Sequence, residues 1–165
     1  MTQPSLTKPT DHSTVPPETG AKMWLECAAC GHRMPLDGRT TQCQACGGDW
    51  VDARYDYQAL APLLRDILPK RPFNSMWRYR ELLPVYHDEN VISMGEGGTP
   101  LVHCKNLGMM LGCPHIYMKD ERQGPTGSFK DRQASLAISV MKELAVSEAV
   151  VASTGNVAIS YAAYG

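Results

Sequence analysis

The chain contains no long apolar run and has almost no net charge. Within its 165 residues, no uninterrupted apolar stretch approaches the roughly 20 residues that a membrane-spanning helix needs. The 16 Lys and Arg residues nearly balance the 17 Asp and Glu residues, and the formal net charge is −1. A basic excess of the kind that binds nucleic acid or anionic membranes is therefore missing. The N-terminus also lacks a secretory signal pattern, so we expect a cytoplasmic protein that binds neither nucleic acid nor membrane.

Large apolar side chains are scarce at the start of the chain. Residues 1–22 are rich in Pro, Thr and Ser, and such a segment buries too little apolar surface to offset the entropy lost on ordering. We predict a disordered tail there. Three further parts follow: a cysteine-rich module over 23–54, a helical connector over 55–90, and an α/β domain over 91–165. The connector's helix is predicted from apolar residues at helical spacing, namely Leu60, Leu63, Leu64, Ile67 and Leu68.

Four of the six cysteines form two CxxC pairs, and the other two, Cys104 and Cys113, stand alone. The spacing C-x2-C-x12-C-x2-C involves Cys27, Cys30, Cys43 and Cys46. Each pair is followed by glycine, which lets backbone N–H groups approach the sulfurs. This pattern favours a structural Zn²⁺ ion held by four thiolates, in a small zinc ribbon that depends on the metal for its stability. Two disulfides, a redox-active CxxC and an iron–sulfur site are the alternatives.

The last 75 residues alternate between strand-like and helix-like patterns. We predict a short helix over 105–112 closed by Gly112, a strand over 115–121, and a long helix capped by Ser128. A short buried strand over 148–153, a tight turn and a further helix from 157 complete the pattern. Such alternation predicts an α/β fold: an open, mostly parallel sheet with flanking helices. The long helix is expected to have a broad apolar face made by Leu136, Ile138, Val140, Met141 and Leu144.

Lys130 and the turn Ser153-Thr154-Gly155-Asn156 are the candidates for chemistry. Lys130 follows the loop of residues 124–128, which contains two glycines and a proline, and lies in the first turn of its helix. The positive end of a helix dipole favours a neutral lysine amine, which imine formation with a carbonyl requires. The turn lies between strand and helix, where free N–H groups bind anions. Both segments are expected at the carboxyl edge of the sheet, where ligands bind in such folds.

Several motifs, in order along the chain, resemble one enzyme family. KDERQGPTGSFKDR together with ASTGN resembles the pyridoxal 5′-phosphate (PLP)-dependent enzymes of the tryptophan synthase β-chain group, known as fold type II. GEGGTPL, WRYRELLP and SFKDR resemble threonine synthase, many members of which carry an N-terminal zinc ribbon.

The resemblance implies a role for each matching residue. Lys130 would be the Schiff-base lysine, with Phe129 packed beside the cofactor. Asn156 would hydrogen-bond the cofactor's 3′-oxygen, and the turn over 153–156 would bind the substrate carboxylate. Asp131 and Arg132 are expected to hold the loop in place. The implied reaction is a PLP-dependent lyase reaction that converts the small amino-acid substrate O-phosphohomoserine and water to threonine and phosphate, in a protein that is commonly a homodimer.

The resemblance has limits that keep alternatives open. Family members are more than twice as long, and the cofactor's phosphate loop and pyridine-nitrogen partner have no counterpart here, so we expect a fragment that is inactive by itself. Position 157 is Val, where many threonine synthases have Thr or Ser. Another fold-type-II enzyme, such as a threonine/serine ammonia-lyase or cysteate synthase, is one alternative. A non-catalytic zinc-ribbon interaction module is the other.

Overall fold

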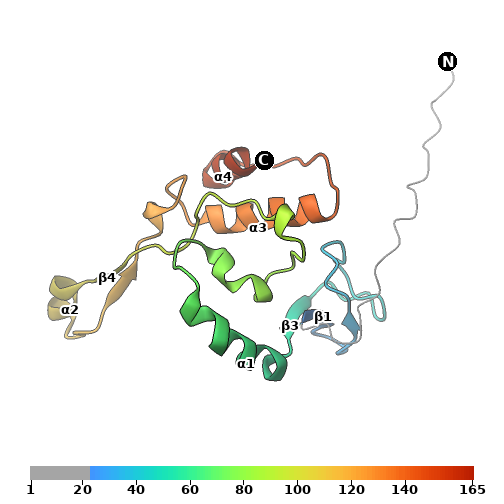
Figure 1. Ribbon diagram of the computed structural model, residues 1–165, viewed down its shortest axis with the longest axis horizontal. Helices are drawn as coiled ribbons and strands as arrows, with labels where there is room; N and C mark the ends of the chain where they lie inside the picture. The colour runs from blue at the N-terminus through green and yellow to red at the C-terminus, as the bar shows by residue number, and fades with distance from the viewer. Residues whose placement is uncertain (1–22) are drawn as a thin grey trace, which may run out of the picture.

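The computed structural model describes residues 23–165, so the tail predicted over 1–22 lies outside the described residues. A small three-stranded sheet stands at one end of the molecule, and a two-stranded sheet with helix α2 projects from the other (Figure 1). Helices α1, α3 and α4 and the connector lie between these two sheets. None of the helices described is long and apolar enough to cross a membrane.

The N-terminal sheet consists of β1 (Met23–Cys27), β2 (Arg33–Met34) and β3 (Val51–Tyr55) in the order β2-β1-β3, with both pairings antiparallel. Alternate residues of β1 are buried, as expected for a strand with one covered face. Its small core combines apolar residues with two of the cysteines: Leu25, Cys27, Met34 and Cys43, with Leu36 and Val51 packed against them.

The connector begins with the predicted helix. Helix α1 spans Tyr57–Ile67, and the side chain of Asp56 caps it by accepting a hydrogen bond from the backbone N–H of Ala59 at 3.0 Å. Three short 3₁₀ helices follow: η1 (Leu68–Lys70), η2 (Met76–Leu82) and η3 (Asp88–Asn90). The helix expected from the leucine spacing is thereby confirmed.

The projecting unit contains β4 (Leu101–His103), α2 (Lys105–Leu111) and β5 (Tyr117–Lys119), and η4 (Glu121–Gln123) follows it. Gly112 ends α2 with φ +65°, a left-handed conformation that glycine adopts at little cost, so the predicted helix end is confirmed. The strand predicted over 115–121 forms as the shorter β5. It pairs antiparallel with β4, with Leu101 opposite Lys119.

Helices α3 (Lys130–Glu143) and α4 (Asn156–Tyr164) lie side by side (Figure 1). The hydroxyl of Ser160, in the middle of α4, donates to Asp131, at the second position of α3, at 2.7 Å. Farther along, a Cβ built on Gly165 would lie 3.9 Å from the side chain of Ile138. The contacts advance together along both helices, so the two N-termini lie at the same end of the pair.

The mixed α/β class is confirmed, but the predicted parallel sheet is not formed by residues 23–165. Both sheets in the described part of the chain are antiparallel. The segment 148–153, predicted as a buried strand, has no regular structure, and its Val150 is 99% exposed. No other described strand lies beside this segment, so its backbone has no ladder of hydrogen bonds to join.

The apolar face of α3 is not its buried side. The apolar residues of that face are partly exposed, whereas the buried positions carry mostly small or polar side chains: Asp131, Ala134, Ser135 and Ser139. Asp131, Ser135 and Ser139 are spaced by four residues, which places them on one side of the helix. Hydrogen bonds from other segments satisfy these side chains, as described below.

Candidate functional site

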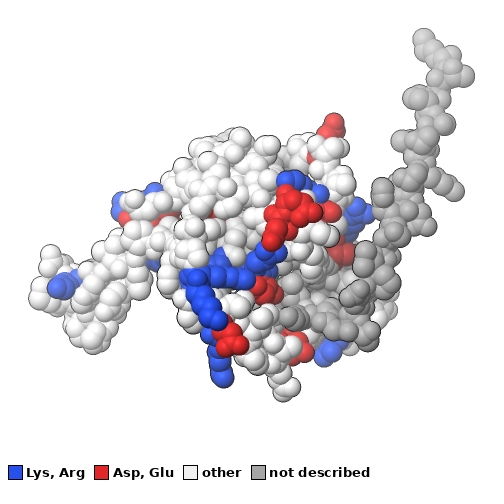
Figure 2. Space-filling view, viewed as in Figure 1, with Lys and Arg blue, Asp and Glu red and all other residues white. Residues whose placement is uncertain are grey.

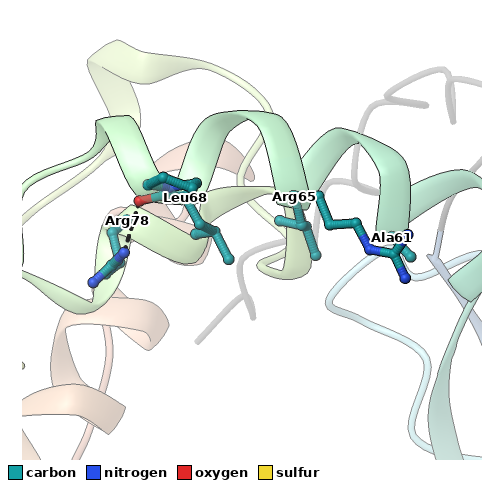
Figure 3. Close-up of a pocket in the computed structure, with 6 residues that line it drawn as sticks. Ala61, Arg65, Leu68 and Arg78 are labelled. Atoms are coloured by element: carbon teal, nitrogen blue, oxygen red, sulfur yellow. Dashed lines mark hydrogen bonds between the residues drawn. The ribbon is translucent and has the colours of Figure 1, made fainter.

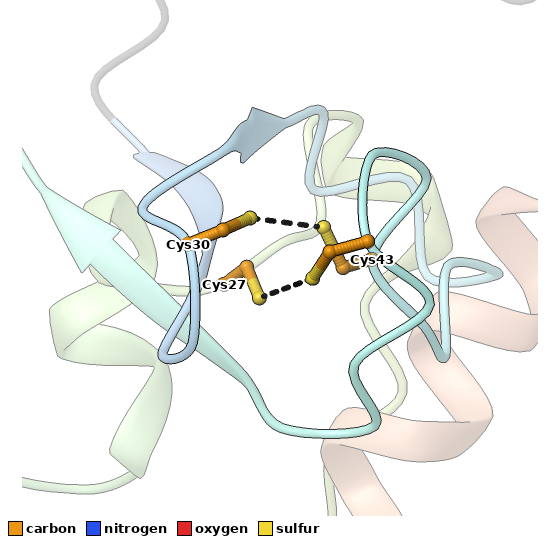
Figure 4. Close-up of side chains that lie close together, drawn as sticks. Cys27, Cys30 and Cys43 are labelled. Carbon is orange, nitrogen blue, oxygen red and sulfur yellow. Dashed lines mark hydrogen bonds between the residues drawn. The ribbon is translucent and has the colours of Figure 1, made fainter.

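The four predicted metal-ligand cysteines converge at one end of the molecule (Figure 4). Their sulfur atoms all lie within 4.8 Å of one another. The sulfurs of Cys27 and Cys46 are 3.7 Å apart, and those of Cys30 and Cys43 are 3.6 Å apart. Four sulfurs about 2.3 Å from a central zinc ion stand about 3.8 Å apart at the corners of a tetrahedron. The spacing therefore fits a four-thiolate metal site and is far too long for disulfide bonds of about 2.05 Å.

Tight backbone turns hold the cysteines in this arrangement. In the first turn, the N–H of Gly31 donates to the carbonyl of Cys27 at 2.9 Å, and in the second, the N–H of Gly47 donates to that of Cys43 at 2.8 Å. Gly31 has φ +71° and Gly47 has φ +72°, conformations that glycine adopts readily. The two CxxC segments thus form two similar knuckles that face each other.

The electrostatics at Cys43, in the second knuckle, favour a thiolate. Burial opposes ionisation of Cys43, but the backbone N–H groups of Cys46 and Ala45 and the neighbouring thiols lower its pKa to about 6. A metal ion binds thiolates rather than thiols. With four protein ligands, a tetrahedral site has no open position for water or substrate, so its role would be structural.

Lys130 lies where the sequence predicted it, at the first position of α3. Its backbone N–H donates to the hydroxyl of the buried Ser128 at 3.2 Å, but the cap residue of α3 is Phe129, one residue after the predicted Ser128 cap. The Lys130 side chain is half-buried, and its Nζ lies 4.4 Å from the ring centroid of Phe129, which is itself 57% exposed. An accessible amine beside an exposed aromatic ring is compatible with covalent capture of an aldehyde.

The loop before Lys130 is fixed by Asp131. This carboxylate is 1% exposed and accepts hydrogen bonds from the backbone N–H and hydroxyl of Thr126 and from the hydroxyl of Ser160. A Cβ on Gly124 would lie 2.9 Å from the Asp131 carboxylate, so the loop passes too close for a larger residue. Asp131 therefore ties the loop both to α3 and to α4.

Arg132 holds the same helix from its other side. It makes two hydrogen bonds of 2.9 Å with the carboxylate of Glu121, whose pKa is lowered chiefly by this contact. Thr99 also donates to Glu121 at 2.8 Å. The contacts of Asp131 and Arg132 are those expected of residues that hold the loop and the helix start.

The turn Ser153-Thr154-Gly155-Asn156 leads directly into α4, and all four residues are exposed. The N–H of Gly155 donates to the hydroxyl of Ser153 at 3.2 Å, which closes the turn. Since α3 and α4 are parallel, this turn and Lys130 occupy the same end of the helix pair. The first N–H groups of a helix have no partner within the helix, and they give this end anion-binding capacity.

Two surface hollows contain none of the predicted site residues. One, of about 640 Å³, is lined by α1 and the connector and includes Arg65 and Arg78, whose side chains point away from each other (Figure 3). The other, of about 480 Å³, lies between α3, α4 and residues 146–151 and is largely apolar. On the face seen in Figure 2, Lys and Arg gather from the centre to the lower edge with Asp and Glu beside them, whereas the area over α4 is uncharged, which agrees with a sequence of α4 without ionic residues.

Sequence reasoning missed a polar cluster behind Lys130, built around Glu96. The clue was the four-residue spacing of polar residues, Asp131, Ser135 and Ser139 on α3 and Ser160 and Tyr164 on α4. A search for apolar periodicity passes over such a stripe.

Comparison with known proteins is consistent with this arrangement. Residues 92–165 match the family described as pyridoxal-phosphate dependent enzyme. A threonine synthase of Methanocaldococcus jannaschii is 38% identical over 142 residues, covering 86% of this chain and 35% of the relative. One from Methanosarcina acetivorans is 36% identical over 141 residues, covering 86% and 34%. One from Mycobacterium bovis is 43% identical over 86 residues, covering 52% and 24%.

Over 86% of its length the chain is similar to these archaeal threonine synthases. The resemblance inferred from the motifs is thereby confirmed, together with the match to a PLP-dependent enzyme family. The chain spans about a third of the length of the two archaeal relatives, 35% and 34%.

Proposed function

We propose that this chain supplies the cofactor-binding lysine, the substrate-carboxylate turn and the structural metal module of a PLP-dependent lyase. The proposed reaction is that of a threonine synthase: O-phosphohomoserine and water give threonine and phosphate. The observation that carries the proposal is the position of Lys130. It starts α3 at the same end as the exposed turn that begins the parallel helix α4.

The residues present fit the cofactor in three respects. Lys130 offers a half-buried amine, Phe129 offers an exposed aromatic face beside it, and the start of α4 offers backbone N–H groups. PLP, when bound, supplies the electron sink that stabilises carbanions at the substrate. No contact with the cofactor's phosphate is assigned to these residues.

Each residue has a proposed task of its own. The Nζ of Lys130 holds the cofactor and, when free, takes and returns protons at the substrate carbons. The amide of Asn156 hydrogen-bonds the cofactor's 3′-oxygen. The N–H and hydroxyl groups of the 153–156 turn bind the substrate carboxylate, and the dipole of α4 favours that negative charge. Val157 brings no hydroxyl to this end, so any contact from position 157 is apolar.

We also propose that Cys27, Cys30, Cys43 and Cys46 hold a structural Zn²⁺ ion. The tetrahedral spacing of their sulfurs supports zinc over a redox role. Elemental analysis of the purified chain should give about one zinc per chain, and a Cys43→Ser variant should contain much less.

The cofactor role of Lys130 is tested by trapping the imine that it forms with PLP. The chain is mixed with excess PLP and reduced with borohydride, and the modified lysine is located by peptide mass spectrometry. We expect the adduct on Lys130, and in a Lys130→Ala variant we expect only slow, scattered labelling. Lys142→Ala, on the exposed surface of the same helix, is the matched control and should leave labelling of Lys130 unchanged.

Labelling that favours other lysines in the wild-type chain would refute the cofactor role and leave a non-catalytic metal module as the better reading. Among fold-type-II reactions, release of threonine and phosphate from O-phosphohomoserine supports the synthase. Release of ammonia from threonine or serine would identify the ammonia-lyase alternative.

A further inference from the structure

Glu96, in the loop GEGG, is completely buried, with 0% of its surface exposed. Its carboxylate accepts hydrogen bonds from the hydroxyl of Ser93 at 3.0 Å, the backbone N–H of Met94 at 3.0 Å, the hydroxyl of Ser135 at 2.7 Å and the phenol of Tyr164 at 2.8 Å. Within the described residues, its hydrogen-bonding partners are all uncharged. A buried carboxylate held only by neutral donors depends on all of them, because an unsatisfied buried acceptor is costly.

The loop that carries Glu96 is itself immobilised by close backbone contacts. The carbonyl of Glu96 accepts from the N–H of Met76 at 2.7 Å. Gly97 has φ +109°, and a Cβ there would lie 2.5 Å from the Met76 nitrogen. A Cβ on Gly98 would lie 2.0 Å from the Phe73 carbonyl oxygen. Only glycine fits at these two positions, so the Glu96 carboxylate, which directly precedes them in the chain, projects from a fixed point.

From this fixed point Glu96 reaches both helices of the candidate site. Ser135 lies on α3, five residues after Lys130, and Tyr164 lies on α4, eight residues after Asn156. Trp77 strengthens the α3 contact, since its indole N–H donates to the Ser135 hydroxyl at 2.8 Å. Glu96 thus bridges the two helices through Ser135 and Tyr164, four residues farther along each helix than the bridge between Asp131 and Ser160.

Hydrogen bonds are directional, whereas apolar burial is not. A helix packed through apolar side chains can turn slightly about its axis at little cost. The face of α3 that packs inward is instead built from Asp131, Ser135 and Ser139, each with hydrogen-bonding partners. These contacts define the rotation of α3, and Lys130, one residue before Asp131, takes its direction from that rotation.

The phenol of Tyr164 is a dependable donor to this cluster. Burial first, and then the hydrogen bond to Glu96, raise the pKa of Tyr164 well above its usual value. The phenol therefore keeps its proton throughout the range in which the protein is handled.

We propose that Glu96 is a positioning residue, which holds α3 and α4 in parallel register so that Lys130 and the 153–156 turn serve one site. The role of Glu96 in arranging a cofactor site rests on the proposed function. The hydrogen bonds that join Glu96 to α3 and α4 are observed in the fold and do not depend on that function. Glu96 touches neither Lys130 nor the turn and acts only through the two helices.

Four variants separate positioning from simple stabilisation. Glu96→Leu keeps the approximate size but removes all acceptors, and Glu96→Gln is the conservative rescue. In Glu96→Gln, the amide oxygen can accept from the Met94 N–H and the Tyr164 phenol. The amide NH₂ can then donate to the hydroxyls of Ser93 and Ser135. Tyr164→Phe removes only the bond to α4. Tyr161→Phe, on the same helix and without a side-chain hydrogen bond in the described structure, is the matched control.

Two readouts are taken on the full chain under conditions in which circular dichroism shows each variant to be folded. The first is the share of borohydride-trapped PLP on Lys130 relative to Lys142. The second, independent of PLP, is amide hydrogen exchange across residues 156–164. For Glu96→Leu we expect the share to fall at least about fivefold and exchange to rise about tenfold, and for Glu96→Gln neither to change more than about twofold.

Tyr164→Phe should raise the amide hydrogen-exchange rate in α4, whereas Tyr161→Phe should not. If Glu96→Leu fails to fold, the comparison of these two variants decides whether the Glu96 bridge holds α4. A folded Glu96→Leu chain with wild-type lysine selectivity and wild-type exchange would overturn the proposal. So would equal exchange in the two tyrosine variants. If the wild-type chain does not label Lys130, the proposed function fails, and the exchange data alone still decide whether Glu96 bridges the helices.

Discussion

Replacement of Asp131 tests how much of the candidate site depends on one buried carboxylate. Asp131 is 1% exposed, and its Oδ2 accepts from the Thr126 N–H at 2.8 Å while its Oδ1 accepts from the hydroxyls of Thr126 and Ser160. Hydrogen bonds to charged groups contribute about 1.5–3 kcal/mol each and are not additive. Asp131→Ala removes three of them, so we expect the free energy of unfolding to fall by about 3–5 kcal/mol.

Asp131→Asn should cost much less. Its amide oxygen can accept from the Thr126 N–H, and its NH₂ can donate to the two hydroxyls, which are able to accept. We expect a loss of about 1–2 kcal/mol. Urea unfolding followed by circular dichroism measures both variants, with Asp66→Ala on the exposed face of α1 as the control expected to stay within about 0.5 kcal/mol of wild type. An Asn variant as unstable as the Ala variant would refute the reasoning, as would an Ala variant that loses less than about 1 kcal/mol.

Two further predictions concern the metal module and a histidine contact. Removal of metal with a chelator should lower the melting temperature of the chain by several degrees or more, because the core of the N-terminal sheet includes Cys27 and Cys43; Cys104→Ser, outside the cluster, should respond like wild type. The hydrogen bond between His87 and Glu143, at 2.6 Å, raises the pKa of His87. A raised folded-state pKa adds stability that is complete below the unfolded pKa of about 6.5 and is lost as pH rises through the folded value. The difference in unfolding free energy between wild type and His87→Ala should therefore be larger at about pH 6 than at about pH 9, and a pH-independent difference would contradict the contact.

Local signals in the sequence predicted much of this structure. The glycine after 105–111 predicts the end of α2, and Ser128 predicts the start of α3, because both act within a few residues of themselves. The two CxxC pairs predict the cluster of thiols for the same reason, since each knuckle is a short turn and only the meeting of the two is non-local.

The failures were all non-local. The alternation of strands and helices favoured a parallel sheet, but pairing depends on which strands lie side by side, and β4 finds β5 as an antiparallel partner. The polar buried side of α3 was not predicted, because apolar periodicity takes no account of hydrogen bonds from distant residues. Ser135 is buried by Glu96 and Trp77, which lie 39 and 58 residues away in the chain.

The contact between the N-terminal module and α3 indicates how the metal cluster relates to Lys130. Arg39, in the segment between the two knuckles, donates to the carbonyl of Leu144 at 3.2 Å, and a Cβ on Gly38 would lie 3.0 Å from the side chains of Val140 and Leu144. This contact is at the C-terminal end of α3, whereas Lys130 is at the other end. A helix of 14 residues spans about 21 Å at about 1.5 Å per residue. The module therefore supports the lysine helix from the end opposite the candidate site, and a metal ion in the cysteine cluster is too distant to take part in chemistry at Lys130.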